Sequence, residues 1–365
     1  MKKIHLLFSI LASLVPLASY GSGTTPKNEN RIFNDNISEP LSDSVSQSHV
    51  NFVFKSHMDG TCEVIRFTDY EEVIVPEYSP DGDLVTAVNL EATRVRRSVK
   101  RLVIPDSVKS IGTSSFYQWT GLEEVTLPKD LEEISWSLFS GCTNLKTIAL
   151  PTAIKKIEGL AFANCSSLMK ITIPDSVETI EDNAFSQCIS LSQVTLSKNL
   201  KSIKEKAFLG CSLLREITIP EGCADIGWEA FRDCTLLQKV TLPESTKNIY
   251  AYAFENCSSL TSITIKKNTE FLGSAFYRCE NLSEVVIEDG VKYISNNAFF
   301  GTKLTKVFIP KSVIFPGSRV FSQCPENLVI YCEAQSKPEN WNNEWNYTSV
   351  NTQFEVVWNA TRESI

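Results

Sequence analysis

Histidine is scarce in this sequence of 365 residues. Only three occur, His5, His49 and His57, so none follows residue 57. Histidine is the commonest general base near neutral pH and the commonest metal ligand. Most of the chain therefore lacks the residue on which Ser–His–Asp and Cys–His catalysis depend, and we predict that the protein is not an enzyme. One alternative stays open, an enzyme whose site lies in residues 50–97 and uses His49 or His57.

Signatures of cofactor, metal and nucleic-acid binding are also missing. The eleven cysteines include no C-x-x-C pair, and there is no phosphate-binding loop and no G-x-G-x-x-G sequence. Acidic residues outnumber basic residues by 43 to 35, which gives a net charge of −8. Nucleic acids and anionic membranes are normally bound by a basic face. We therefore expect no cofactor, no metal and no nucleic-acid partner.

Long apolar runs are absent except at the start of the chain. Two lysines and the almost wholly apolar run of residues 4–18 precede small residues between positions 19 and 23. This order is typical of a secretory signal peptide, and the run is shorter than the ~20 residues that span a bilayer. We predict a signal peptide over residues 1–22, a flexible polar lead-in over 23–50 and no membrane span in the mature protein. The protein would then be exported, and would be secreted, periplasmic or held at the cell surface.

What the sequence does contain is one pattern copied about ten times. Phenylalanine recurs every 22 or 23 residues, with columns of leucine, proline and isoleucine at the same period. A clean copy, Leu168 to Cys188, reads LMKITIPDSVETIEDNAFSQC. This period is typical of leucine-rich repeats. The phenylalanines are Phe116, Phe139, Phe162, Phe185, Phe208, Phe231, Phe254, Phe276, Phe299 and Phe321.

Each copy predicts one coil of a solenoid. The alternating β-branched segment, such as Ile171 to Ile173, favours a short strand, and the proline after it ends the strand because proline has no N–H to donate. The F-x-x-C segment suits a tight helical turn. A single unit cannot bury enough apolar surface to fold, so the coils must stack. We predict an α/β solenoid of about ten right-handed coils over residues 99–332, with short helical turns and one long parallel sheet.

The repeated L-x-x-[VI]-x-[LI]-P, I-x-x-x-[AS]-F and F-x-x-C elements resemble the BspA-like leucine-rich repeat family. The resemblance implies an N-terminal capping hairpin region over residues 51–98 and a C-terminal cap over 333–365. It also implies an exported surface protein associated with adhesion to host or neighbouring-cell proteins.

Eight of the eleven cysteines occupy one column of the repeat. A column of identical, parallel Cβ vectors suits a reduced core position better than disulfides. We predict a buried, structural cysteine ladder, and a Cys324–Cys332 disulfide stays open as an alternative. The ladder comprises Cys142, Cys165, Cys188, Cys211, Cys234, Cys257, Cys279 and Cys324.

The outward side chains of the predicted strands are the candidate partner-binding residues. Threonine is common there, which β-propensity alone explains, whereas Val286 and Phe308 make an apolar strip that is either a contact patch or covered by the C-terminal cap. The main hypothesis is a non-enzymatic binding protein for an extracellular or host protein, and the alternative is a glycan-capture accessory protein. The candidates are Glu124, Thr126, Lys170, Thr172, Glu216, Thr218, Lys239, Thr241, Glu284, Val286, Lys306 and Phe308.

Overall fold

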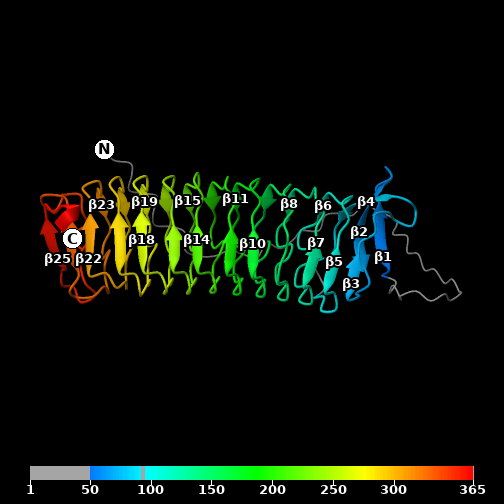
Figure 1. Ribbon diagram of the computed structural model, residues 1–365, viewed down its shortest axis with the longest axis horizontal. Helices are drawn as coiled ribbons and strands as arrows, with labels where there is room; N and C mark the ends of the chain where they lie inside the picture. Colours follow the sequence, from blue (N-terminus) through cyan, green and yellow to red (C-terminus); the bar gives the residue numbers. More distant parts are fainter. Residues whose placement is uncertain (1–49, 92–94, 365) are drawn as a thin grey trace, which may run out of the picture. The chain divides into compact units, whose positions relative to one another are not determined.

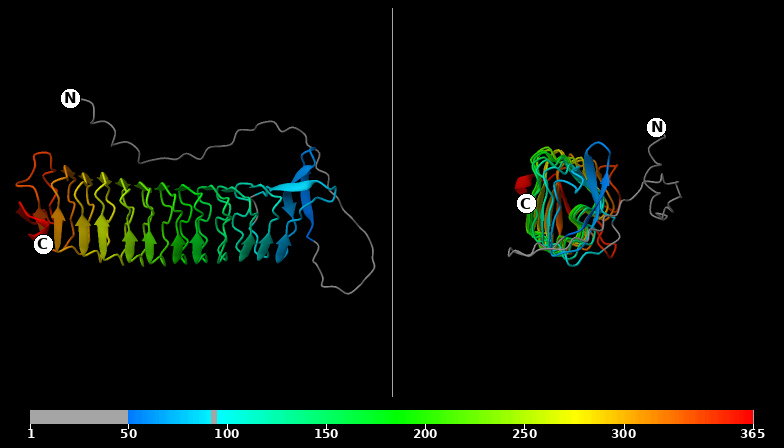
Figure 2. Two further views of the ribbon diagram at one scale, coloured as in Figure 1. Left: turned by 45° about the horizontal axis from the view of Figure 1, so that its top comes forward. Right: turned by 90° about the vertical axis from the view of Figure 1, so that its right-hand side faces the viewer.

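The computed structural model describes residues 50–91 and 95–364, which lie in one compact unit, Asp43–Ile365. The predicted signal peptide and almost all of the predicted lead-in lie outside the described residues. Within them the chain winds into stacked coils, and two rows of short strands run along the stack (Figure 1). Seen along the stack, the coils superpose around a shared interior (Figure 2).

The first row is built by the alternating segment of each repeat. With the single paired residue Thr147, its strands make thirteen rungs in the described part of the chain. The rungs form two- and three-stranded parallel sheets in which each residue lies opposite its repeat counterpart, as Lys170 lies opposite Gln193. The strands are β3 (Glu72–Ile74), β5 (Arg101–Val103), β7 (Glu124–Thr126), β10 (Lys170–Thr172), β12 (Gln193–Thr195), β14 (Glu216–Thr218), β16 (Lys239–Thr241), β18 (Ser262–Ile265), β20 (Glu284–Ile287), β22 (Lys306–Ile309), β24 (Val329–Cys332) and β25 (Glu355–Trp358).

The second row forms the long continuous sheet, with nine parallel strands. It is built by the isoleucine column, which the sequence indicated only as the far side of the coil. The prediction of one long sheet on the alternating segments was therefore wrong about its location. The strands are β8 (Glu133–Ile134), β9 (Lys156–Ile157), β11 (Thr179–Ile180), β13 (Ser202–Ile203), β15 (Asp225–Ile226), β17 (Asn248–Ile249), β19 (Phe271–Leu272), β21 (Tyr293–Ile294) and β23 (Phe315–Pro316).

The predicted helical turns are not formed, so the α/β class is wrong for the described residues. Their only helical segment is the 3-10 turn η1 (Arg362–Ser364). The reason lies on either side of most core phenylalanines. Around Phe185, for example, Asn183 and Gln187 have φ of 57° and 58°, a left-handed conformation that interrupts a right-handed helix. The turn instead bonds to the next coil, as when the Phe185 N–H donates to the Ala207 carbonyl at 2.8 Å.

The phenylalanine column is the centre of the core. All ten phenylalanines are fully buried. Consecutive rings from Phe139 to Phe321 stack with centroids 5.2 to 5.7 Å apart and nearly parallel planes. Offset stacking of this kind adds to the stabilisation from apolar burial. The column fixes the spacing of the coils and therefore of every exposed column.

Both ends of the coil stack are covered. At the start, β1 (Phe52–Ser56) and β2 (Thr61–Phe67) form an antiparallel hairpin, and their sheet continues through β4 (Leu84–Val88) and β6 (Ser110–Ile111). Arg96 is buried there, with its guanidinium 4.4 Å from the centre of the Phe67 ring. At the far end three tryptophans cluster, and the Trp341 ring lies 4.9 Å from that of Trp345 and 6.0 Å from that of Trp358.

Candidate binding surface

The outward side of the first row, here called the first face, carries most of the candidates named from the sequence. In its outer column, acidic and basic side chains often lie in register. Glu72, Arg101 and Glu124 occupy successive rungs, and Glu216 lies opposite Lys239. Arg101 is ion-paired with Glu72, and its Nε lies 3.9 Å from Glu124 Oε2. Charges on this face are therefore largely compensated along the stack.

The inner column of the first face is mostly threonine. Thr126, Thr172, Thr218 and Thr241 are exposed and lie at equivalent positions of their coils. Val286 ends this run with 36% of its surface exposed. The face brings the candidates together as a regular polar surface, without a concentration of charge of one sign.

Phe308 is a correction to the predicted exposed strip. It is only 4% exposed, because the guanidinium of Arg362 lies 4.8 Å from the centre of its ring. Arg362 also donates through Nη2 to the Ile287 carbonyl at 2.6 Å. For Phe308, covering by the C-terminal segment is therefore the explanation that holds, whereas Val286 stays exposed.

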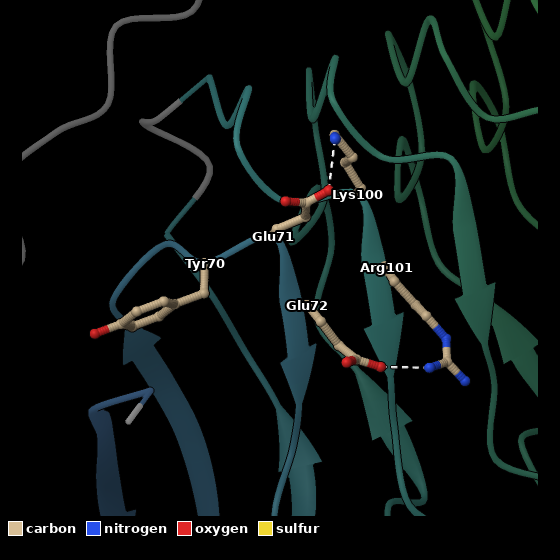
Figure 3. A pocket seen from close by; sticks show the side chains of 5 residues that line it. All are labelled: Tyr70, Glu71, Glu72, Lys100 and Arg101. Carbon is tan, nitrogen blue, oxygen red and sulfur yellow. Dashed lines mark hydrogen bonds and ion pairs between the residues drawn. The ribbon is translucent and has the colours of Figure 1, made fainter. Parts of the chain in front are cut away.

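A surface depression lies at the start of the first face, where β3 meets β5. Figure 3 shows its five lining residues, Tyr70, Glu71, Glu72, Lys100 and Arg101. Lys100 Nζ lies 2.5 Å from Glu71 Oε1, and this hydrogen bond raises the pKa of Lys100. Arg101 pairs with Glu72 in the same way. The four charged groups of the depression are therefore paired with each other, and Tyr70 is its fifth lining residue.

The cysteine column lies inside the stack and faces no surface. All eight members are buried and free, and so are Cys62, Cys223 and Cys332. The Cys324–Cys332 disulfide is not formed. Each thiol of the column lies within hydrogen-bond distance of the phenylalanine carbonyl of the preceding coil, as Cys188 Sγ lies 3.1 Å from Phe162 O. Burial raises the pKa of Cys279 to about 12, so this thiol is neutral and inert at physiological pH.

The outward side of the second row, here called the second face, holds a column that the sequence did not reveal as a unit. Its outer column is polar from β8 to β17 and then changes to Phe271, Tyr293 and Phe315, here called the aromatic column. Tyr293 is 42% exposed and Phe315 is 45% exposed, while Phe271 is half-buried. The sequence shows three aromatic residues at the repeat period. Predicting an exposed column from them requires knowing that the residues just before the isoleucine column point outward.

The surroundings of the aromatic column are uncharged or charge-balanced, apart from the exposed Lys247. In register beside Phe271 lies Asn248, whose Nδ2 donates to Asp225 Oδ1 at 2.7 Å. In the neighbouring column, Lys292 Nζ lies 3.7 Å from Glu270 Oε1. No group of three or more metal-ligating side chains occurs among residues 50–91 and 95–364. In that same part of the chain, no helix is long and apolar enough to cross a bilayer.

Comparison with known proteins gives a consistent picture of the fold. A family model described as the BspA type leucine-rich repeat region matches residues 94–215 and 201–327, with six copies. The crystal structure of a leucine-rich cell surface protein from Faecalibacterium prausnitzii A2-165 is 22% identical, covers 87% of this chain and 97% of its own, and gives a TM-score of 0.53.

A leucine-rich repeat protein from Bacteroides ovatus ATCC 8483 is 24% identical, with coverage of 86% and 99% and a TM-score of 0.57. At these identities the likeness concerns the fold. No protein of curated function matches this sequence.

Proposed function

Because the chain belongs to the BspA-type leucine-rich repeat family, we propose that it is an exported, non-enzymatic protein that binds an extracellular macromolecule through a side of its coil stack. The family match confirms the resemblance drawn from the repeated motifs. The proposal assigns the binding to the first or second face, because solenoids commonly use extended repeat surfaces in this way. A partner can contact several equivalent residues on successive coils, so many weak contacts add up.

The observation that carries the proposal is the exposure of regular side-chain columns on a stack with a continuous core of stacked phenylalanine rings. Thr172 and Thr218 on the first face, and Tyr293 and Phe315 on the second, are exposed at positions fixed by the coil spacing. Such a surface loses little conformational entropy on binding, which favours affinity. The absence of histidine after residue 57 supports a non-enzymatic role.

Export is supported by the signal-like start of the sequence and by the description of the Faecalibacterium structure as a cell surface protein. Fractionation of the natural host, with detection of the protein by antibody, tests this part of the proposal. The protein should appear in the medium, in the periplasm or on the outside of protease-accessible cells. Recovery only with cytoplasmic markers would refute export.

Binding is tested by titrating the purified protein onto immobilised extracellular-matrix proteins and onto whole cells. The proposal predicts saturable binding to at least one of these surfaces. Absence of saturation on all of them would contradict it. Heat-unfolded protein is the control, because a face made by stacked coils exists only in the folded state.

A further inference from the structure

We propose that the aromatic column on the second face binds a neutral glycan chain by stacking of sugar rings on Phe271, Tyr293 and Phe315. This inference rests on the proposed binding function and names the chemistry of the partner. It concerns a surface different from the first face, which carries the residues named from the sequence.

The spacing of the three aromatic rings suits a glycan chain. The three residues lie in register on β19, β21 and β23, so they are separated by one strand spacing each, which is about 4.8 Å. This repeat is comparable to the length of one pyranose ring. A glycan chain lying along the stack can therefore place successive sugars over successive aromatic side chains.

Glycines lie beside two of the three rings. Two residues after Phe271 and Phe315, just beyond the ends of β19 and β23, the chain has Gly273 and Gly317. A Cβ at Gly273 would lie 2.5 Å from the backbone nitrogen of Ala251, so close coil packing requires glycine there. These glycines let the coils approach closely, and the Tyr250 ring of the preceding coil lies 6.1 Å from that of Phe271.

The charges around the aromatic column favour a neutral partner. An anionic glycan would need a cluster of unpaired basic groups, but the neighbouring column holds only Lys247 and Lys292, and Lys292 is paired with Glu270. Polar groups near the column are amides and hydroxyls, such as those of Asn248 and Ser295. The exposed Asn296 uses its Oδ1 to accept from the Ser318 N–H at 2.7 Å, a bond that does not use its NH₂ group. Sugars present C–H groups on the ring face and hydroxyls at the edge, so rings flanked by neutral hydrogen-bonding groups complement a neutral glycan.

The contrast with the rest of the second face supports the assignment. The same column carries Glu133, Lys156 and Asp225 in earlier coils. Exposed aromatic residues are unfavourable for solubility and are concentrated here on three successive strands, together with the exposed Ile314 beside Phe315. Exposed apolar patches of this kind mark binding sites.

The test is affinity electrophoresis and calorimetry of the full protein with laminarin, mannan, dextran and galactomannan, and with polygalacturonate as an anionic probe. We expect binding to at least one neutral polysaccharide and none to polygalacturonate. Tyr293→Ala and Phe315→Ala should each weaken binding at least tenfold, which corresponds to about 1.4 kcal/mol. The matched control is Tyr78→Ala, which removes an aromatic side chain of similar exposure, 55%, outside this surface and should leave binding unchanged. Thermal unfolding of each variant checks that it is folded.

Two outcomes overturn the inference. One is that no neutral polysaccharide binds, or that the two aromatic variants bind as well as the control. The other is that the variants lose binding to an immobilised protein and no glycan binds, which would make the column a protein-docking site. In both cases the proposed function still holds if the parent protein binds matrix proteins or cells saturably. If that binding is absent as well, the glycan inference and the proposed function are both refuted.

Discussion

Two buried threonines provide a sharp test of how the core is assembled. Thr246 and Thr269 are fully buried at the core position that holds valine or leucine in other coils, for example Val177 and Leu200. Neither hydroxyl oxygen has a hydrogen-bond partner. Thr246→Val and Thr269→Val keep the shape of the side chain and remove the unpaired hydroxyl, so each should increase the free energy of unfolding.

The magnitude follows from the cost of burying a hydroxyl without a partner. Mutational data place that cost at about 1–3 kcal/mol, and we expect a gain of about 1 kcal/mol for each valine. With an unfolding entropy of roughly 2.1 cal/mol/K per residue over about 310 residues, this raises the melting temperature by about 1–2 °C. The two sites lie on adjacent coils, so the gain of the double variant need not be the sum of the two.

Thr302→Val is the matched control. Thr302 is also buried, but its Oγ1 donates to the Phe299 carbonyl at 3.0 Å. Valine there should lower the free energy of unfolding by about 1 kcal/mol, the net contribution of one hydrogen bond; the Phe299 carbonyl keeps the Cys324 thiol at 3.3 Å as a partner. Urea titration followed by circular dichroism measures all three variants. The reasoning is refuted if the three substitutions shift stability in the same direction.

Three further predictions concern the core and the N-terminal end. Phe208→Ala should lower the free energy of unfolding by about 3–5 kcal/mol in urea titration, because the ring is buried between those of Phe185 and Phe231; an unchanged midpoint would show that the column does not hold the coils together. Burial raises the pKa of Cys223 and Cys332 from 9.0 to about 12. Their contribution to stability should therefore be complete below pH 9 and lost as the pH rises toward 12, and a thiol reagent at pH 8 should label unfolded but not native protein. Arg96→Ala removes a guanidinium that pairs with Asp69 and lies against Phe67 and Trp119. It should destabilise the protein by about 2 kcal/mol and speed amide exchange in β1 and β2 more than in β14, and equal exchange rates in both regions would argue against a role at the N-terminal end.

Much of the fold follows from the sequence because one pattern decides it many times over. The period places phenylalanine, leucine, isoleucine and cysteine in columns, and a residue such as Phe162 has only one way to be buried when ten copies must be buried alike. The same redundancy predicts that the alternating segments are extended and that proline ends them.

The turns and the long sheet could not be predicted in the same way. Residues such as Leu160 and Lys206 adopt left-handed φ of 58° and 56° although they are neither glycine nor asparagine. They do so because hydrogen bonds to the next coil hold them there, and such bonds exist only in the stacked state. The sheet of two-residue strands has the same origin, since Ser202–Ile203 is too short to show strand periodicity.

The candidate surfaces were predicted in part. The exposed threonine and charged columns of the first face lie where the alternation places them, whereas Phe308 does not, because Arg362 is distant in sequence and returns over it. The aromatic column needed knowledge of which residue of the isoleucine segment faces outward, and this depends on the turn before it.

The central claim is that a side of the coil stack is the binding surface. It is tested most directly by one set of binding isotherms on cells from the natural surroundings, measured with the parent protein, Thr172→Arg/Thr218→Arg on the first face and Tyr293→Ala/Phe315→Ala on the second. The account predicts saturable binding by the parent and at least tenfold weaker binding, about 1.4 kcal/mol, by one of the two variants with unchanged melting temperatures. Two results would contradict it. One is binding that does not saturate up to about 1 mM, which corresponds to roughly −4.1 kcal/mol. The other is a set of isotherms that are identical for all three proteins.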